Sequence, residues 1–280
     1  MKFYESIADY YDYIFDPEDS AEVINDLYLN INSKLNTNTN TNTNLNLNAS
    51  LNTNLNANTN ANANSKPCRI IDIGCATGKL ADGLSAFGHE VTAIDLDGRM
   101  IEIAEGKYMQ SGMKLKFMRE NMLEVGRVFG AGYFDAAVCV GNTIVHLEGY
   151  EKIKEFFSAV NKILKSGAVF IAQILNYDRI ISQKINKLAL IENDEIKFER
   201  HYDLDTAKNG GLIIFKTRLT VKRGGGAIIE NESPLYPAKK NEIESALSAA
   251  GFSDINFYSD IDKTLFSIDK SGPLAFSAVK

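Results

Sequence analysis

The sequence predicts an α/β fold: a mainly parallel sheet covered by helices on both faces, with an inserted antiparallel β meander. Between residues 69 and 176, short continuous apolar runs alternate with segments whose apolar residues recur at helical spacing. This pattern is typical of a parallel sheet buried on both sides. Three strand patterns then follow, separated by the turn sequences AKNGG and RGGG, which favour hairpin connections. Such an insertion is expected to act as a lid or platform outside the main sheet.

The elements follow from local apolar spacing and from the turn residues between them. In the first half, strands are expected at residues 69–73, 90–96, 115–119, 134–140 and 168–175, and helices at 79–87, at 149–164, and after the second strand up to about residue 111. The meander strands are expected at 195–204, 211–221 and 227–233. A helix at 239–250, ended by Gly251 as its C-cap, and strands at 255–258 and 273–279 complete the chain.

One block stands apart from this pattern. Residues 36–64 are almost wholly Asn alternating with Thr, Leu or Ala. The alternation has the period of a strand, but Asn is a poor strand former and the block has too little apolar surface to offset its ordering entropy. We therefore expect a disordered insertion at 36–64, between an N-terminal helical lid at 1–35 and a main domain at 65–280 that includes the meander as a subdomain at 189–236.

Composition limits the possible partners and surroundings. The 280 residues carry a net charge of −6 without a long Lys/Arg run, so no nucleic-acid partner is expected. No apolar run approaches the roughly 20 residues of a membrane span, and residues 1–13 are aromatic and charged, unlike a signal peptide; we expect a cytoplasmic protein without a membrane partner. Cys68, Cys75 and Cys139 fall in or beside predicted strands as buried thiols, and the histidines lack metal-ligand spacing.

The most informative segment is IIDIGCATGKL, residues 70–80, which predicts a buried strand, a glycine turn and the start of a helix. A turn of this kind brings backbone N–H groups and a helix N-terminus to a ligand. A dinucleotide fingerprint would need glycines where Ala76 and Lys79 stand, and a P-loop would need four residues instead of three between Gly74 and Gly78. The spacing therefore argues against both a nicotinamide site and a P-loop.

What remains is D-x-G-x-A-x-G from Asp72 to Gly78. It resembles the first motif of the class I S-adenosylmethionine-dependent methyltransferases, acidic-x-G-x-G-x-G, with Ala76 at the middle glycine; a structural turn in another α/β protein is the alternative. Asp95 ends the second strand, where an acidic residue roughly 20 positions after the turn can accept hydrogen bonds from both ribose hydroxyls. Asp97 precedes Gly98 and a helix and is the better candidate for an N-cap.

Other segments resemble the same family. VCVGNTIVHL, residues 138–147, is similar to the CxGNSxxHL segment of methyltransferases related to the glycine and sarcosine N-methyltransferases. AAGFSDINFY is similar to the family's passage from helix to sixth strand, and the order of elements resembles its Rossmann-like seven-stranded sheet, whose last strand is antiparallel. The resemblance implies S-adenosylmethionine as cofactor and methyl transfer by in-line displacement. The acidic net charge and the lid-like insertion favour a small-molecule acceptor. An amine is favoured, because it needs little more than deprotonation and placement, whereas an oxygen acceptor would need a base.

The resemblance also implies roles for individual residues. Asn142 and His146 would face the junction of cofactor and acceptor, as candidate catalytic residues. Asn121 would hold the adenine, although it could instead cap the short helix after it. Tyr11 would cover the methionine end of the cofactor, with Tyr4 and Tyr10 as substitutes. The expected cofactor-binding set is Tyr11, Asp72, Gly74, Cys75, Ala76, Gly78, Asp95, Leu96, Met100, Asn121, Met122, Val140 and Gly141.

The acceptor is expected between the 142–146 segment, the loop NYDRI after the fifth strand, and the meander. Its candidate contacts are Tyr177, Arg179, Arg200, Tyr202 and Tyr236. An arginine there could pair with a carboxylate, although a surface ion pair is the simpler role for any one of them. Ala76 and Asn121 depart from the family pattern, which leaves open a non-catalytic module that binds S-adenosylmethionine or a protein partner. The sequence leaves the acceptor, the methylated atom and the oligomeric state undetermined.

Overall fold

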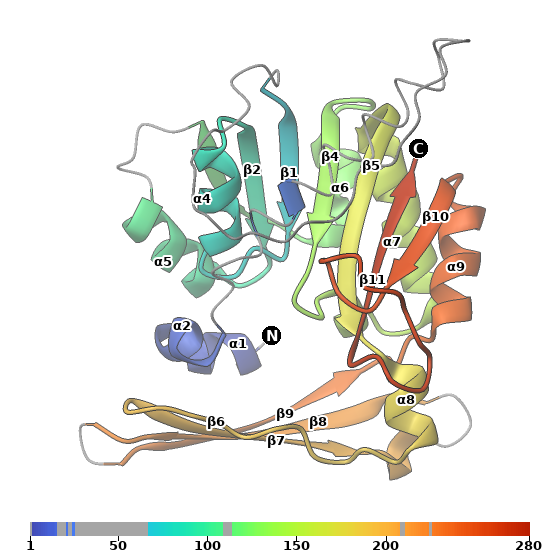
Figure 1. Ribbon diagram of the computed structural model, residues 1–280. Coiled ribbons are helices and arrows are strands. Elements are labelled where there is room, and N and C mark those ends of the chain that lie inside the picture. The colour runs from blue at the N-terminus through green and yellow to red at the C-terminus, as the bar shows by residue number, and fades with distance from the viewer. Residues whose placement is uncertain are drawn as a thin grey trace, which may run out of the picture.

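The computed structural model describes residues 2–15, 21, 24–25, 67–108, 114–207, 211–223 and 226–280. Its main sheet has seven strands in the order β10-β11-β5-β4-β1-β2-β3 (Figure 1). Their bounds are β1 Arg69–Ile73, β2 Glu90–Asp95, β3 Leu115–Arg119, β4 Phe134–Cys139, β5 Leu164–Leu175, β10 Ser253–Tyr258 and β11 Pro273–Val279. β11 pairs antiparallel with both β5 and β10, and the remaining pairs are parallel. The predicted fold class is therefore confirmed.

Helices cover both faces of this sheet. α4 (Lys79–Ala86) and α5 (Gly98–Tyr108) pack on one face. α6 (Val125–Val128), α7 (Tyr150–Ile163) and α9 (Lys240–Ala249) pack on the other. α7 shows why the pattern was readable: its apolar residues recur at helical spacing and all are fully buried, namely Ile153, Phe156, Phe157, Val160 and Ile163. Burying each such side chain stabilises the fold by roughly 1.5–3 kcal/mol.

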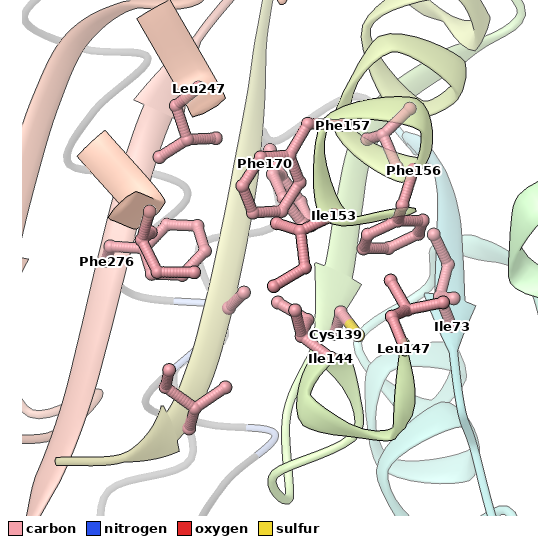
Figure 2. Packing of buried hydrophobic residues seen from close by; sticks show 14 of the residues in the cluster. Ile73, Cys139, Ile144, Leu147, Ile153, Phe156, Phe157, Phe170, Leu247 and Phe276 are labelled. Atoms are coloured by element: carbon pink, nitrogen blue, oxygen red, sulfur yellow. The ribbon is translucent and has the colours of Figure 1, made fainter. Parts of the chain in front are cut away.

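Aromatic rings fill the layer between α7 and the sheet. Phe157 lies edge-on to Phe170 of β5 and to Phe276 of β11, with ring centroids 5.8 and 6.0 Å apart. Figure 2 shows Phe157 and Phe170 between α7 and β5, and Phe276 and Leu247 on the side of α9. This packing fixes β5, and with it the loop that follows its carboxyl end.

A second sheet is antiparallel and consists of β6 (Ile191–Glu192), β7 (Ile196–Asp203), β8 (Ile213–Val221) and β9 (Ile228–Leu235). Figure 1 shows it beyond the carboxyl ends of the main strands, with the N-terminal helices between the two sheets. These are α1 (Lys2–Ile7), the 3-10 turn η1 (Ala8–Tyr10) and α2 (Tyr11–Ile14). Ile7 and Ile14 pack on Phe198 and Leu219 of the second sheet. We call residues 2–15 the lid.

Some expectations need correction. The segment after the fifth strand is a helix, α8 (Tyr177–Ser182), because Asn176 caps it by accepting a hydrogen bond from the Arg179 N–H at 3.2 Å. β5 begins at residue 164 instead of 168, because Leu164 pairs with Phe134 before a register shift. Cys68 is half-buried, whereas Cys75 and Cys139 are buried.

Several expectations fall outside the residues that the structure describes. They are the Asn-rich block at 36–64, most of the expected lid beyond residue 15, the end of the helix expected to reach residue 111, and parts of the turns AKNGG and RGGG. Within the described ranges, no helix is long and apolar enough to cross a membrane.

Candidate functional site

A cavity lies at the carboxyl ends of the main strands, covered by the lid and the second sheet. It has two compartments that share Tyr4, Tyr11, Gly74, Ala76 and Gly141. The first compartment, about 70 Å³, also includes Asp95, Leu96, Asp97, Met100, Glu120, Asn121, Met122, Thr143 and His146. The second, about 450 Å³, extends to the second sheet and includes Asp12, Ile14, Phe15, Asp72, Cys75, Lys79, Val140, Asn142, Gln173, Leu175, Leu188, Arg200, Tyr202, Phe215 and Asp260.

The glycine turn forms the wall common to both compartments. Gly74 has a φ of +79°, and a Cβ on it would lie 2.4 Å from Cγ2 of Thr143, so this position needs glycine for the turn to pack against the loop after β4. Ala76 also has a positive φ, 47°. Its N–H donates to Oδ2 of Asp95 at 2.9 Å. A carboxylate on the neighbouring strand therefore holds the turn where the usual middle glycine is absent.

Asp95 and Asp97, at the end of β2, have different roles: Asp95 holds the glycine turn, and Asp97 caps α5. Asp95 accepts from the Ala76 N–H through Oδ2 and from the Asp97 N–H through Oδ1, both at 2.9 Å. Asp97 caps α5 by accepting from the Arg99 N–H at 2.9 Å, as its position before a helix predicts. Asp95 is thus fixed in orientation at the edge of the first compartment, and each of its oxygens retains a lone pair for a ligand.

Asp72 is a buried carboxyl group at the carboxyl end of β1. Its Oδ2 has no hydrogen-bond partner among the residues that the structure describes. Burial, and secondarily the charge of Asp95, raise the pKa of Asp72 to about 7. A buried oxygen without a partner is costly unless a ligand supplies a donor. A cationic donor at this end of the second compartment would satisfy it best.

The loop after β4 brings Asn142 and His146 to the cavity. Asn142 adopts a left-handed φ of 68°. Its Oδ1 accepts from the Leu175 N–H at 2.9 Å and its Nδ2 donates to the Tyr177 hydroxyl at 3.0 Å. These bonds fix the amide on the chain following β5, so Asn142 tethers the two loops that border the cavity.

His146 lies against the lid. Its Nε2 is 2.9 Å from the Tyr4 hydroxyl, and the two rings meet edge to face with centroids 5.3 Å apart. Burial lowers the pKa of His146 to about 4, so the ring is neutral at physiological pH. Tyr4 and Tyr11 both line the cavity, whereas Tyr10 packs in the apolar cluster between lid and second sheet.

The segment after β3 contributes Asn121 and Met122 to the first compartment. Oδ1 of Asn121 accepts from the Leu123 N–H at 3.0 Å and so caps the short turn η3 (Met122–Glu124). The capping role and the ligand-facing position therefore coexist. The carboxamide nitrogen is the part of Asn121 that the cap does not use.

The residues expected at the acceptor divide into three groups. Arg200 and Tyr202 line the second compartment. Tyr177 is fully buried and reaches the site through Asn142. Arg179 and Tyr236 line neither compartment, and the Tyr236 hydroxyl donates to Glu242 at 2.5 Å.

Every residue of the expected cofactor-binding set lines one of the two compartments, except Gly78, which lines neither. A Cβ on Gly78 would lie 2.6 Å from the Phe117 ring, so this glycine serves the packing behind the turn. Residues that sequence reasoning missed include Gln173, whose Oε1 accepts from the Gly141 N–H at 3.0 Å. Phe215 was also missed, although strand alternation opposite Tyr202 could have indicated it.

This chain is similar to known proteins described as methyltransferases. The family described as "Methyltransferase domain" matches residues 70–167. A glycine/sarcosine N-methyltransferase of Aphanothece halophytica is 24% identical over 203 residues, 72% of each chain. A ubiquinone biosynthesis O-methyltransferase of Dechloromonas aromatica (strain RCB) is 27% identical over 108 residues, 39% of this chain and 44% of that protein. The chain spans only 42% of the length of two other curated relatives that it matches.

Solved structures share the fold. An S-adenosylmethionine-dependent methyltransferase from Clostridium acetobutylicum ATCC 824 superposes with a TM-score of 0.65 at 20% identity, covering 75% of this chain and 83% of that one.

Proposed function

We propose that this chain, whose residues 70–167 match a methyltransferase-domain family, is a class I S-adenosylmethionine-dependent methyltransferase that methylates a small-molecule acceptor, with an amine nitrogen favoured over oxygen. The observation that carries the proposal is the pair of adjoining compartments at the carboxyl ends of the strands, which share five lining residues. Asp95 and Asn121 line the first compartment, and Asn142 and Tyr202 line the second. Ligands of open α/β sheets bind at this edge.

The residues at this edge fit the cofactor. Asp95, held by two backbone N–H groups, suits the ribose hydroxyls. Asn121 and Met122 suit the adenine. The orphaned Oδ2 of Asp72 suits the ammonium group at the methionine end, beside the turn from Gly74 to Gly78. When bound, S-adenosylmethionine supplies a methyl group that is already activated on a sulfonium sulfur.

The protein's own part is then placement and exclusion of water. Tyr4 and Tyr11 of the lid cover the shared wall of the cavity. Asn142 links the loop after β4 to Leu175 at the end of β5 and to Tyr177. These hydrogen bonds fix the position of the acceptor side of the cavity. The acceptor's nitrogen would contribute its lone pair to the new N–CH3 bond while the S–CH3 bond breaks and its electron pair stays on sulfur. The methylated nitrogen would then lose a proton to solvent or to a neighbouring hydrogen-bond acceptor.

The preference for nitrogen rests on His146. Its pKa of about 4 makes the ring a weak base near neutral pH. A neutral amine needs little more than placement, whereas a hydroxyl acceptor needs a stronger base. The matched relatives include both an N- and an O-methyltransferase by name, so their names do not decide between the two atoms.

The test is methyl transfer itself. Purified protein is incubated with methyl-labelled S-adenosylmethionine and matched pairs of amines and phenols, and S-adenosylhomocysteine and methylated product are measured by mass spectrometry. We expect turnover with at least one amine and slower turnover with the matched phenol. Methylation of tRNA or protein alone would contradict a small-molecule acceptor. Cofactor binding without turnover on any of these compounds would instead favour a non-catalytic binding module.

A further inference from the structure

Arg200 brings a positive charge into the second compartment, and none of the described residues forms an ion pair with it. It lies on β7 on the same side as Phe198 and Tyr202, the side that faces the lid and the cavity. The guanidinium carbon is 5.9 Å from the centre of the Phe198 ring, and Nη2 donates to the Ala189 carbonyl at 2.8 Å. Nε is buried without a hydrogen-bond partner in the part of the chain that the structure describes.

This charge is poorly compensated. Burial lowers the pKa of Arg200, and the opposing influence comes from the Tyr202 hydroxyl and not from a carboxylate. A half-buried cation that lacks an anion is costly, because desolvation is not repaid by an ion pair. The guanidinium still has donors that Ala189 does not use, and their geometry suits a carboxylate. The position therefore calls for an anionic ligand group.

The wall around Arg200 is apolar and rich in rings. Tyr202 and Phe215 lie on neighbouring strands with centroids 5.3 Å apart. Other ring and aliphatic side chains that line the compartment include Tyr4, Tyr11, Ile14, Phe15, Leu175 and Leu188. A cavity of this character binds the flat or apolar body of a ligand, while a few polar groups fix its orientation.

The other charged side chains of the compartment limit the charge of the anion that Arg200 can bind. Its acidic side chains are Asp12, Asp72 and Asp260, and Lys79 is the other cationic side chain in the lining. A dianionic phosphate would meet one unpaired guanidinium in a largely acidic surrounding. A single carboxylate matches the single charge of Arg200.

Building on methyl transfer in this cavity, we propose that the acceptor is an apolar, ring-containing small molecule with one carboxylate, and that Arg200 binds this carboxylate. Arg200 then determines specificity: it orients the acceptor from the side of the second sheet, and the reacting atom points toward the wall formed by Gly141 and Asn142. This role does not require Arg200 to touch the cofactor.

A matched pair of probes tests this inference without knowledge of the acceptor. The protein is saturated with S-adenosylhomocysteine, and the affinities for 3-phenylpropionate and for its amide, 3-phenylpropionamide, are compared by ligand-observed NMR. We expect the carboxylate to bind at least about 10-fold more tightly, because hydrogen bonds to charged groups contribute roughly 1.5–3 kcal/mol. Arg200→Gln should abolish this preference, and Arg200→Lys should retain part of it.

The control is Arg218→Gln. Arg218 lies on the same sheet but on its exposed face, paired with Glu230 at 3.4 Å, so its loss makes the same change in net charge and should leave the preference intact. Equal affinity for the two probes in the native protein, including no binding of either, would overturn the inference. So would a preference that survives in Arg200→Gln. Unchanged S-adenosylhomocysteine affinity in the variants shows that they fold. A lost preference between the two probes then reflects lost binding of the carboxylate, not a damaged cofactor site. A native protein that does not bind S-adenosylhomocysteine would overturn the methyl-transfer proposal and this inference together.

Discussion

Asp72 couples the stability of the free protein to pH. Its folded pKa of about 7 lies above the value near 3.9 of an unfolded Asp. Between about pH 4 and pH 7 the unfolded chain gives up this proton while the folded chain keeps it, so the contribution of Asp72 to the free energy of unfolding falls as pH rises through that window. Asp72→Asn should remove this contribution and make the free protein more stable at about pH 8, by roughly 2–4 kcal/mol.

Urea unfolding of both proteins at about pH 5 and about pH 8 checks this prediction. The difference between native and variant isolates Asp72 from the other carboxyl groups. A variant that is less stable than the native protein at the higher pH, or a difference independent of pH, would contradict the assigned burial of this carboxyl group.

His146 should not titrate in the working range of the enzyme. With a pKa of about 4, the ring is largely neutral from about pH 5 upward, because a group loses most of its bound proton within about one pH unit above its pKa. For an amine acceptor, kcat/KM should therefore rise with pH at a midpoint set by the acceptor's own amine. The same midpoint should persist in His146→Gln, even if the rate is lower. A midpoint that vanishes in the variant would identify His146 as the titrating base.

The lid is attached to the main domain through the side chain of Asp12. Asp12 accepts from the Thr77 hydroxyl at 2.5 Å and pairs with Lys107, so it links α2 to the glycine turn and to α5. Asp12→Ala should loosen this closure and raise the dissociation rate of S-adenosylhomocysteine by roughly 5- to 10-fold, the effect of losing about 1–1.5 kcal/mol of hydrogen bonding. Stopped-flow displacement measures that rate.

Glu151→Ala is the matched control for the lid prediction. Glu151 forms an exposed ion pair with Lys154 on α7, one helical turn away in the same helix and outside the cavity. Its removal should leave dissociation unchanged. Equal rates in the two variants would mean that the Asp12 contacts do not hold the lid closed.

Elements with strong periodicity or a following glycine were predictable. β1 matches its predicted bounds, and α7 matches because five buried apolar residues recur along it. α8 was missed because six residues with two buried side chains, Tyr177 and Ile180, give no readable period. The early start of β5 was missed because Lys165 and Gly167 look like a turn, yet Lys165 reaches Asp135 and the strand continues.

Some residues of the site were predictable from the sequence and others were not. Asp95 and Asn121 could be found because Asp95 ends β2 and Asn121 lies two residues after the end of β3, and the carboxyl ends of both strands had to lie at the ligand edge. Arg179 and Tyr236 could not be judged from sequence, because side-chain direction around the inserted sheet depends on tertiary packing. Tyr236 turns to Glu242 of α9 and away from the cavity. Tyr4 was only a substitute for Tyr11, but both border the cavity.

At the scale of the whole molecule, the described residues already supply both sheets, the lid and the two adjoining compartments of the site. Replacing residues 36–64 by a short Gly/Ser linker should therefore leave the free energy of unfolding within about 1 kcal/mol of the native value, because loop length enters closure entropy only logarithmically. S-Adenosylhomocysteine affinity should also be unchanged. A Gly/Ser linker of the original length separates the effect of length from that of composition. A large loss in both linker variants would show that the Asn-rich block contributes structure.

The central claim is that the carboxyl edge of the main sheet holds S-adenosylmethionine through Asp95. Calorimetric titration of S-adenosylhomocysteine into the native protein and into Asp95→Asn and Asp95→Ala tests it most directly. The account predicts one site per chain and a loss of roughly 1–3 kcal/mol in binding free energy for Asp95→Ala, with a smaller loss for Asp95→Asn, which can still accept the Ala76 N–H. Absence of binding to the native protein, or equal affinity in all three proteins, would contradict it.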